Sequence, residues 1–344
     1  MNKPLLFIIS LFISISFPND SIFSNTNIGA YGELHWNTEK QKIDFHRFVI
    51  FLGYNWDKNW SFKSEVQLKN NVVGDSHDGT IELQKGYVNY NSELWGFKGG
   101  VLVAPVGIIN PYHEPPTFLS VERPFYSTEI IPTTWFGNGF SFYGNIGNIQ
   151  LELAMLEDLN GKNILEGETK SIKYGQNKGS NATATDILGT KIFSISWIGI
   201  DGLRIAGSYA LNDAPVEIDP ASGEAIDILS TTLIELNTMY SKNNIHAVFE
   251  YGMNEFSHPS SSWKNSGYYL DIGYNIGSLI DMNSVLMPWI RTSSYSIDSI
   301  KTNILLYGLT YKPIPSISFK VDMGTNKTSN TKSNILNIGL GYMF

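Results

Sequence analysis

Alternating apolar and polar residues recur along most of the chain in segments of roughly ten residues. The clearest segment is WSFKSEVQLKN, from Trp60 to Asn70. Its apolar side chains fall on one side of an extended chain and its charged side chains on the other, which is the period-two pattern of a β-strand. Similar alternation occurs in residues 149–155, 203–211, 245–253, 268–276 and 317–323. Each such strand has one face suited to an apolar medium and one suited to water.

The connections between these predicted strands alternate between short and long. The short ones are Trp56–Trp60, Asn91–Gly96, Ile146–Asn148, Gly199–Gly202, Ser241–Asn244, Gly277–Asn283 and Lys312–Ser316. The long ones are Asn37–Lys42, Asn70–Thr80, Ala104–Trp135, Glu157–Asp186, Asn212–Leu229, Glu255–Asn265, Ser293–Ile300 and Thr325–Ser333. This order predicts an all-β fold, a transmembrane antiparallel β-barrel of about 16 strands with short periplasmic turns and long external loops.

The end of the chain, Asn334–Phe344, has an uninterrupted apolar side and stops on an aromatic residue. This ending resembles the closing strand of bacterial outer-membrane barrels, which the barrel-assembly machinery recognises. The resemblance implies that machinery as a partner.

Tryptophans mark both ends of the predicted strands. Four lie beside short connections and three near long ones: Trp56, Trp60, Trp95 and Trp197, then Trp36, Trp135 and Trp263. Aromatic rings favour the two membrane–water interfaces, so this placement predicts two aromatic girdles. The alternative is that these rings form the core of a soluble β-sandwich.

Composition narrows the partners. The net charge of −8, without a basic run, argues against nucleic acid. The chain has no cysteine, which excludes structural disulfides and a lipoprotein anchor. Lys3 precedes the apolar run 5–17, so residues 1–22 are predicted to be a signal peptide cleaved between positions 18 and 27. Residues 23–344 then form a single barrel domain.

The third long connection, residues 104–135, contains six prolines, several apolar side chains and a cluster of charges. Proline fixes φ and lowers the entropy lost on ordering, so the segment can hold a defined shape without being a strand. A long apolar loop in solvent would be unusual. We therefore expect it to fold into the barrel and narrow the lumen.

Seven short segments carry a resemblance to a known family. They are RFVIFLG (47–53), APVGIIN (104–110), HEPPTF (113–118), VERP (121–124), IPTTW (131–135), MPWIR (287–291) and YKP (311–313). They resemble segments of the phosphate-selective porin (porin O and P) family and its porin-like relatives. The resemblance implies a channel of sixteen strands, often a homotrimer, with inward-folded loops.

Phosphate selectivity in that family is associated with a dense ladder of arginines and lysines. This chain has 24 basic against 32 acidic residues and no concentrated run of either. The architecture therefore carries over by resemblance, and phosphate selectivity does not.

The loop and the inward strand faces supply the candidate site residues. The predicted pore constriction consists of His113, Glu114, Glu122, Arg123 and Glu129. The predicted pore wall consists of Arg47, Lys63, Glu65, Arg204, Glu250, Asp271, Arg291, Lys320 and Asp322. Opposed charges across a narrow pore filter solutes by charge. The alternative is that Glu122 and Arg123 only tie the loop to the wall.

The sequence thus predicts a passive porin in the bacterial outer membrane, with lipid and small hydrophilic solutes or ions as partners and no cofactor or metal. A non-channel barrel, such as an adhesin or a structural protein, is the first alternative. A barrel hydrolase using His246 and Glu250 is the second, although no HExxH or GxSxG motif occurs. The acidic stretch 213–227 is either a calcium site or, preferably, a solvated loop.

Overall fold

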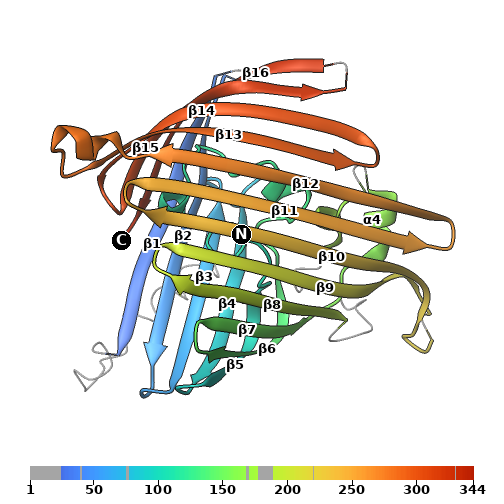
Figure 1. The fold of residues 1–344 in the computed structure, drawn as a ribbon. Helices are drawn as coiled ribbons and strands as arrows, with labels where there is room; N and C mark the ends of the chain where they lie inside the picture. The colour runs from blue at the N-terminus through green and yellow to red at the C-terminus, as the bar shows by residue number, and fades with distance from the viewer. Residues whose placement is uncertain are drawn as a thin grey trace, which may run out of the picture.

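Sixteen antiparallel strands form a closed barrel in the computed structural model (Figure 1). The structure describes residues 25–38, 41–74, 77–167, 170–176, 189–219, 221–329 and 331–344. The predicted signal peptide, residues 1–22, lies outside these ranges. The predicted fold class is confirmed.

The first eight strands are β1 (Thr26–Asn37), β2 (Lys42–Asn55), β3 (Trp60–Lys69), β4 (Thr80–Asn91), β5 (Trp95–Val103), β6 (Phe136–Ile146), β7 (Ile149–Leu156) and β8 (Thr190–Ile200). The second eight are β9 (Leu203–Ile218), β10 (Ala225–Lys242), β11 (Ile245–His258), β12 (Ser261–Tyr274), β13 (Val285–Ile297), β14 (Ile300–Ile314), β15 (Ile317–Thr328) and β16 (Thr331–Met343). Each strand pairs with its sequence neighbours.

The barrel closes where the first strand meets the last. β1 and β16 pair antiparallel, and the backbone N–H of Ala30 donates to the carbonyl of Phe344 at 2.9 Å. Phe344 returns a bond to the carbonyl of Ala30 at 2.8 Å. Closure leaves no sheet edge, so the backbone groups of the wall are paired with each other and can enter hydrocarbon. We call the end that carries both termini the periplasmic end and the opposite end the external end.

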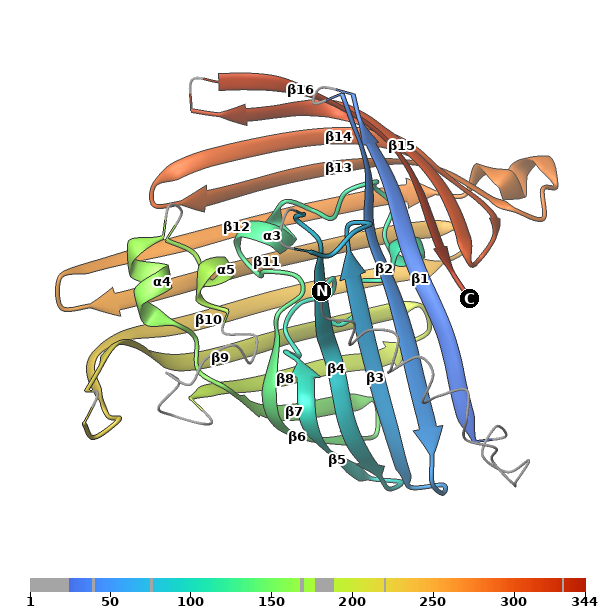
Figure 2. The ribbon, with the colours of Figure 1, turned by 180° about the vertical axis from the view of Figure 1, so that it is seen from behind.

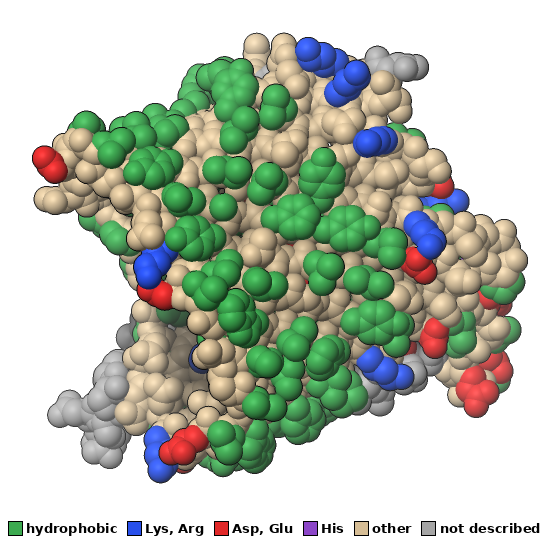
Figure 3. Space-filling model, viewed as in Figure 1, with side chains coloured by type: hydrophobic (Ala, Val, Ile, Leu, Met, Phe, Trp, Pro, Cys, Tyr) green, Lys and Arg blue, Asp and Glu red, His purple; other side chains and the backbone are tan. Residues whose placement is uncertain are grey.

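The outer wall carries a belt of exposed apolar side chains. Ile50, Leu153 and Leu236 are 49%, 46% and 57% exposed. Figure 3 shows apolar side chains spread over the outer faces of the strands, with charged side chains mainly at the margins. Apolar area of this extent requires a nonpolar surrounding medium. No helix among the described residues is long and apolar enough to cross a membrane.

The predicted alternation of loop lengths is wrong in the second half of the chain. The external connections there are shorter than predicted, at 219–224, 259–260, 298–299 and 329–330. The periplasmic connection 275–284, predicted to be short, contains the 3-10 helix η2 (Ile276–Ile280). Strands such as β10 extend beyond the membrane, and their polar residues there still form β-pairs with the neighbouring strands. Assigning polar stretches to loops therefore made the predicted loops too long.

The aromatic girdles are only partly as predicted. Trp56, Trp60 and Trp95 are exposed on the outside at the periplasmic end. Trp135, however, is 4% exposed inside the barrel. Trp263 also faces inward and stacks on Phe256, with ring centroids 4.7 Å apart. These two rings belong to the internal core.

Two external loops fill much of the lumen. Residues 104–135 join β5 to β6 and include η1 (Pro115–Thr117) and α3 (Tyr126–Glu129). The connection from β7 to β8 includes α4 (Gly161–Glu166) and α5 (Ile172–Gly175). Figure 2 shows α3 and α5 within the ring of strands. Apolar side chains of both loops, including Ile130, Ile164 and Ile172, form one buried core with the inner wall.

Candidate pore and its lining

The third loop, residues 104–135, is fastened by charged side chains on β15. Lys320 Nζ donates to the carbonyls of Pro115 and Ser120 at 2.7 and 2.9 Å. The carboxylate of Asp322 accepts from the backbone N–H of Val121 at 2.7 Å. Hydrogen bonds to charged groups are stronger than neutral ones, so these contacts hold the loop against the wall.

An ion pair on β12 and β13 holds the same part of the loop. Arg291 donates to both carboxylate oxygens of Asp271 at 2.5 and 2.6 Å, and its third nitrogen donates to Ser120 Oγ at 2.7 Å. Arg291 is 2% exposed. Its role in the described structure is therefore to fix the loop, since it has little contact with free water.

Two further wall charges bind the loop on other sides. Arg47 donates to Glu33 and to the carbonyl of His113, both at 2.6 Å. Glu250 accepts from the backbone N–H of Ile108 at 3.2 Å. Of the predicted pore wall, six residues thus contact the loop directly, namely Arg47, Glu65, Glu250, Asp322, Lys320 and Arg291, and Asp271 acts on it through Arg291.

Wall glycines give the loop room to approach. A Cβ added at Gly252 would lie 2.4 Å from the hydroxyl oxygen of Tyr126, and one at Gly339 would lie 2.7 Å from Val121. Any larger residue at these strand positions would push the loop away. Burial of the Tyr126 phenol raises its pKa well above the ordinary value, so it stays neutral.

The predicted constriction residues are dispersed in the structure. His113 is fully buried, with its Nδ1 2.8 Å from the carbonyl of Asn110. Glu122 lies 2.9 Å from His35. Burial opposes ionisation of Glu122, but the hydrogen bond and charge of His35, together with the charge of His46, outweigh burial and lower the pKa of Glu122. The carbonyl of Glu114 accepts from Thr117 within η1. These groups mainly shape the loop.

Glu129 contacts the second inward loop, which the sequence analysis did not identify. Lys173 Nζ lies 3.2 Å from the Glu129 carboxylate, and Ser171 Oγ donates to the Glu129 carbonyl at 2.8 Å. The available signals were Asn160 and Ser171, two typical helix N-cap residues followed by apolar side chains. The predicted constriction is therefore a joint structure of two loops.

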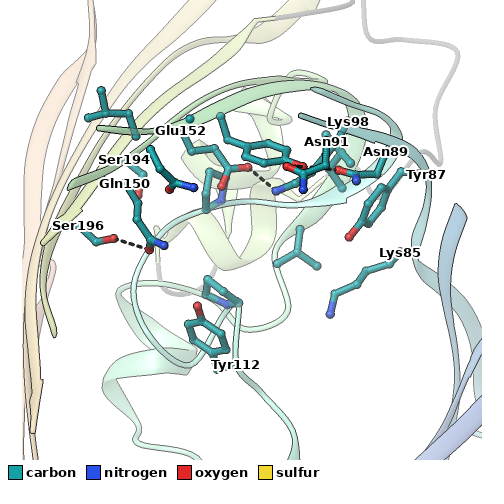
Figure 4. A pocket seen from close by; sticks show the side chains of 18 of the residues that line it. Lys85, Tyr87, Asn89, Asn91, Lys98, Tyr112, Gln150, Glu152, Ser194 and Ser196 are labelled. Atoms are coloured by element: carbon teal, nitrogen blue, oxygen red, sulfur yellow. Dashed lines mark hydrogen bonds and ion pairs between the residues drawn. The ribbon is translucent and has the colours of Figure 1, made fainter. Parts of the chain in front are cut away.

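A large polar cavity remains between the third loop and the inner faces of β3–β9. We call it the periplasmic cavity; its volume is about 610 Å³. Lys63, Lys85, Tyr87, Asn89, Lys98, Tyr112, Tyr143, Gln150, Glu152, Ser194, Ser196 and Arg204 are among the residues that line it. Figure 4 shows Lys85 and Tyr112 extending into it from opposite sides. Water-filled lumens of outer-membrane barrels have polar linings of this kind.

Positive charge exceeds negative charge in the periplasmic cavity. Lys98 pairs with Glu152 at 2.8 Å, and Lys85 pairs with Glu65 at 2.7 Å. Lys63 and Arg204 also line the cavity, and within the described part of the chain neither forms an ion pair. The predicted wall residues Lys63 and Arg204 therefore border open space as two cationic groups that form no direct ion pair within the described residues, although the buried carboxyl groups of Glu235 and Glu250 lie near Arg204.

A second, smaller cavity of about 110 Å³ lies at the external side of the same wall. We call it the external cavity; it is lined by His46, Arg47, Gln67, Lys69, Glu82, Gln84, Arg123, Thr133 and Thr134. One guanidinium nitrogen of Arg47 and one of Arg123 are buried there without a hydrogen-bond partner. Among the predicted constriction residues, Arg123 is the one that borders this cavity.

A narrow layer separates the two cavities along β3 and β4. Lys63 lines the periplasmic cavity and Gln67 the external cavity, so Glu65 lies between them on the same strand face. The β3–β4 register shifts beside Glu65, which places both Gln84 and Lys85 at this level. Bulges of this kind re-aim side chains at functional sites in barrels.

Comparisons with known proteins agree on the fold. No known family model matches the chain. An uncharacterized protein of Aquifex aeolicus is 27% identical over 363 residues, covering 92% of this chain and 80% of that protein. The anion-selective porin from Comamonas acidovorans has a TM-score of 0.64 at 10% identity, covering 93% of this chain and 100% of that one.

Two further solved structures are similar to this chain. Salmonella typhi OmpF has a TM-score of 0.64 at 11% identity, covering 93% of this chain and 98% of that one. The outer membrane channel DcaP of Acinetobacter baumannii has a TM-score of 0.62 at 10% identity, covering 93% and 97%. The likeness is therefore to outer-membrane porins and channels in general, and membership of the phosphate-selective family stays a prediction. The apolar belt and this fold together place the chain in a bacterial outer membrane.

Proposed function

We propose that the chain is a passive outer-membrane channel for small hydrophilic solutes, narrowed by residues 104–135 and favouring anions. The observation that carries this proposal is the polar cavity of about 610 Å³ beside the loop. The permeation path runs along the inner faces of β3 and β4, past the layer at Glu65, to the external cavity. No step of it requires chemistry or a cofactor.

The anion preference follows from charges at both ends of this path. Among the residues that the structure describes, Lys63 and Arg204 form no ion pair at the periplasmic side, and Lys69 and Arg123 line the external side together with one carboxylate, Glu82. Fields from fixed charges are strong where low-dielectric walls confine water. The net charge of −8 does not oppose this, because many carboxylates bind the loop or pair with lysines inside the wall.

The test is the zero-current potential of purified protein in a planar bilayer under a KCl gradient. We expect open-channel steps and a potential whose sign corresponds to chloride permeating faster than potassium. Replacing Arg123 and Lys63 together by glutamine is expected to move the potential toward cation preference. If the unmodified protein gives open-channel steps but a potential that indicates cation preference, and the double variant does not change it, the anion preference is refuted. The channel function would still stand.

The alternative of a plugged, non-channel barrel is favoured by one observation. Glu65 is held from several sides at the narrow layer: Lys85 Nζ lies 2.7 Å away, Tyr31 Oη 3.5 Å and His113 Nε2 3.5 Å. A closed barrel of this kind would give no steps at any voltage. The same bilayer experiment therefore discriminates between the two functions.

The homotrimer and the barrel-assembly machinery remain part of this proposal. The first rests on the family resemblance, and the second on the alternating strand β16 (Thr331–Met343) and the aromatic Phe344 beside it. Cross-linking of the protein in native membranes tests for a trimer. Removal of Phe344 is expected to lower the amount of folded barrel in the outer membrane.

A further inference from the structure

An apolar cavity of about 220 Å³ opens off the lumen between the third loop and β9–β12. We call it the side cavity. Its loop-side walls are Ile108, Ile109 and Phe118, and its barrel-side walls include Met239 and Val248. Positions on the inner face of a water-filled barrel are normally polar. Apolar side chains at facing positions of both loop and wall therefore form a distinct feature of this lumen.

The side cavity communicates with the proposed path. Tyr112 and Arg204 line both the side cavity and the periplasmic cavity. Tyr112 is 50% exposed, so the two spaces meet beside its ring. The two cavities therefore adjoin at these two side chains, and a solute would enter the side cavity there.

Arg204 supplies a cation at this junction. One of its terminal nitrogens donates to Asn237 at 2.9 Å, whereas its Nε is buried and has no hydrogen-bond partner in the part of the chain that the structure describes. A buried N–H without a partner is costly, and an anion at the junction would satisfy it. Asp271 also lines the side cavity, but both its oxygens are already bound by Arg291. Asp271 therefore adds little net negative charge.

Two further carboxyl groups lie near Arg204 without lining the cavity. Glu235 and Glu250 are 0% and 1% exposed, and Glu250 is covered by the backbone of Ile108. Asn237 donates to Glu235 at 2.7 Å and so separates it from Arg204. His246 completes the polar rim of the side cavity. The junction thus presents one cation beside an apolar space.

The volume sets the size of the apolar group. An engineered apolar cavity of about 150 Å³ in another protein binds benzene. The side cavity, at about 220 Å³, accommodates one six-membered ring or a short branched chain. A carboxylate attached directly to that ring would lie at Arg204.

We propose that the side cavity is a binding subsite for small amphipathic carboxylates, with the carboxylate at Arg204 and the apolar group between the third loop and β10–β11. The proposal rests on the proposed channel function and names one class of solute for it. Such solutes would dwell in the channel longer than purely hydrophilic anions of the same charge.

The experiment measures the single-channel KCl current while benzoate or acetate is added at constant ionic strength. Cyclohexanecarboxylate serves as a second ring of similar size. Burial of a ring's apolar surface is expected to lower the half-blocking concentration about tenfold or more relative to acetate. Because this comparison uses the unmodified protein, it decides the proposal even where a variant does not fold.

Two variants locate the effect. Val248→Asn makes the wall of the side cavity polar and is expected to reduce the benzoate-to-acetate ratio to below about threefold. The matched control, Val72→Asn, changes a valine that is 50% exposed in the external connection between β3 and β4. The control is expected to keep both the conductance and the ratio.

The outcomes separate this inference from the channel function. Open-channel steps with equal block by benzoate and acetate would overturn the subsite and leave the channel standing. A tenfold ratio that survives Val248→Asn unchanged would also overturn it, because the ring would be bound elsewhere. Absence of steps from folded protein would remove the channel function and the subsite together.

Discussion

The ion pair between Arg291 and Asp271 gives the most quantitative test of how the third loop is held. Replacing Arg291 with methionine leaves the Asp271 carboxylate, which is 3% exposed, without its two charged hydrogen bonds. Breaking a buried pair in this way costs about 3–5 kcal/mol. Loss of the bond to Ser120 adds about 1.5–3 kcal/mol, since its donor is charged.

The double variant Arg291→Met with Asp271→Asn removes the stranded charge. Its cost is expected to be lower than that of Arg291→Met alone by about 2 kcal/mol or more, since no buried charge then lacks a partner. Asp271→Asn alone completes the thermodynamic cycle. The free energy of coupling is the quantity that the cycle isolates.

Equilibrium unfolding in urea, followed by tryptophan fluorescence of the barrel in lipid vesicles, measures these differences. Trp289 is a local reporter because the Arg291 guanidinium lies 5.6 Å from its ring centroid. Loosening of the loop should also increase open-channel noise in the single variant. Equal stability losses in the single and double variants would show that Arg291 does not neutralise Asp271.

Three further predictions concern the loop and its surroundings. Gly339→Val should displace the loop at Val121, where even a Cβ would lie 2.7 Å away, and change the conductance; Gly74→Val, with only one atom 3.7 Å from its added Cβ, is the control. Lys173→Ala should lower stability by less than about 1 kcal/mol in urea unfolding, because the pair with Glu129 is partly exposed. The lowered pKa of Glu122 means that its contribution is complete above the ordinary value of 4.5 and is lost as pH falls through the folded-state pKa. Lowering the pH should therefore increase open-channel noise less in Glu122→Gln than in the unmodified protein. An equal increase in both proteins would show that the Glu122–His35 contact does not hold the loop.

The strands were predictable because alternation of apolar and polar residues shows which side of a segment faces lipid. This signal does not depend on which strands the segment pairs with. The segment Trp60–Asn70 shows this directly, since it was predicted to be a strand and β3 occupies Trp60–Lys69 of it. Strand ends were not predictable, because polar residues outside the membrane pair as well as apolar ones do. β9 and β10 therefore continue through much of the stretch 212–229 that was expected to be a loop.

The candidate site was less accessible from sequence. Lys63 and Lys320 both occupy inward, charged positions, yet Lys63 borders open space and Lys320 binds two loop carbonyls. Only the path of residues 104–135 distinguishes them, and alternation does not encode that path. The side cavity was also missed, since Met239 and Val248 look like ordinary strand residues until the loop is seen opposite them.

The absence of native cysteine permits a direct test of the proposed path by cysteine substitution on β4. Asn89 lines the periplasmic cavity, whereas its neighbour Val88 is 38% exposed on the outer face of the barrel. A charged, water-soluble thiol reagent added during single-channel recording should reduce the current of Asn89→Cys and leave that of Val88→Cys unchanged. Equal currents before and after labelling in Asn89→Cys, with labelling verified by mass, would contradict a path along this wall.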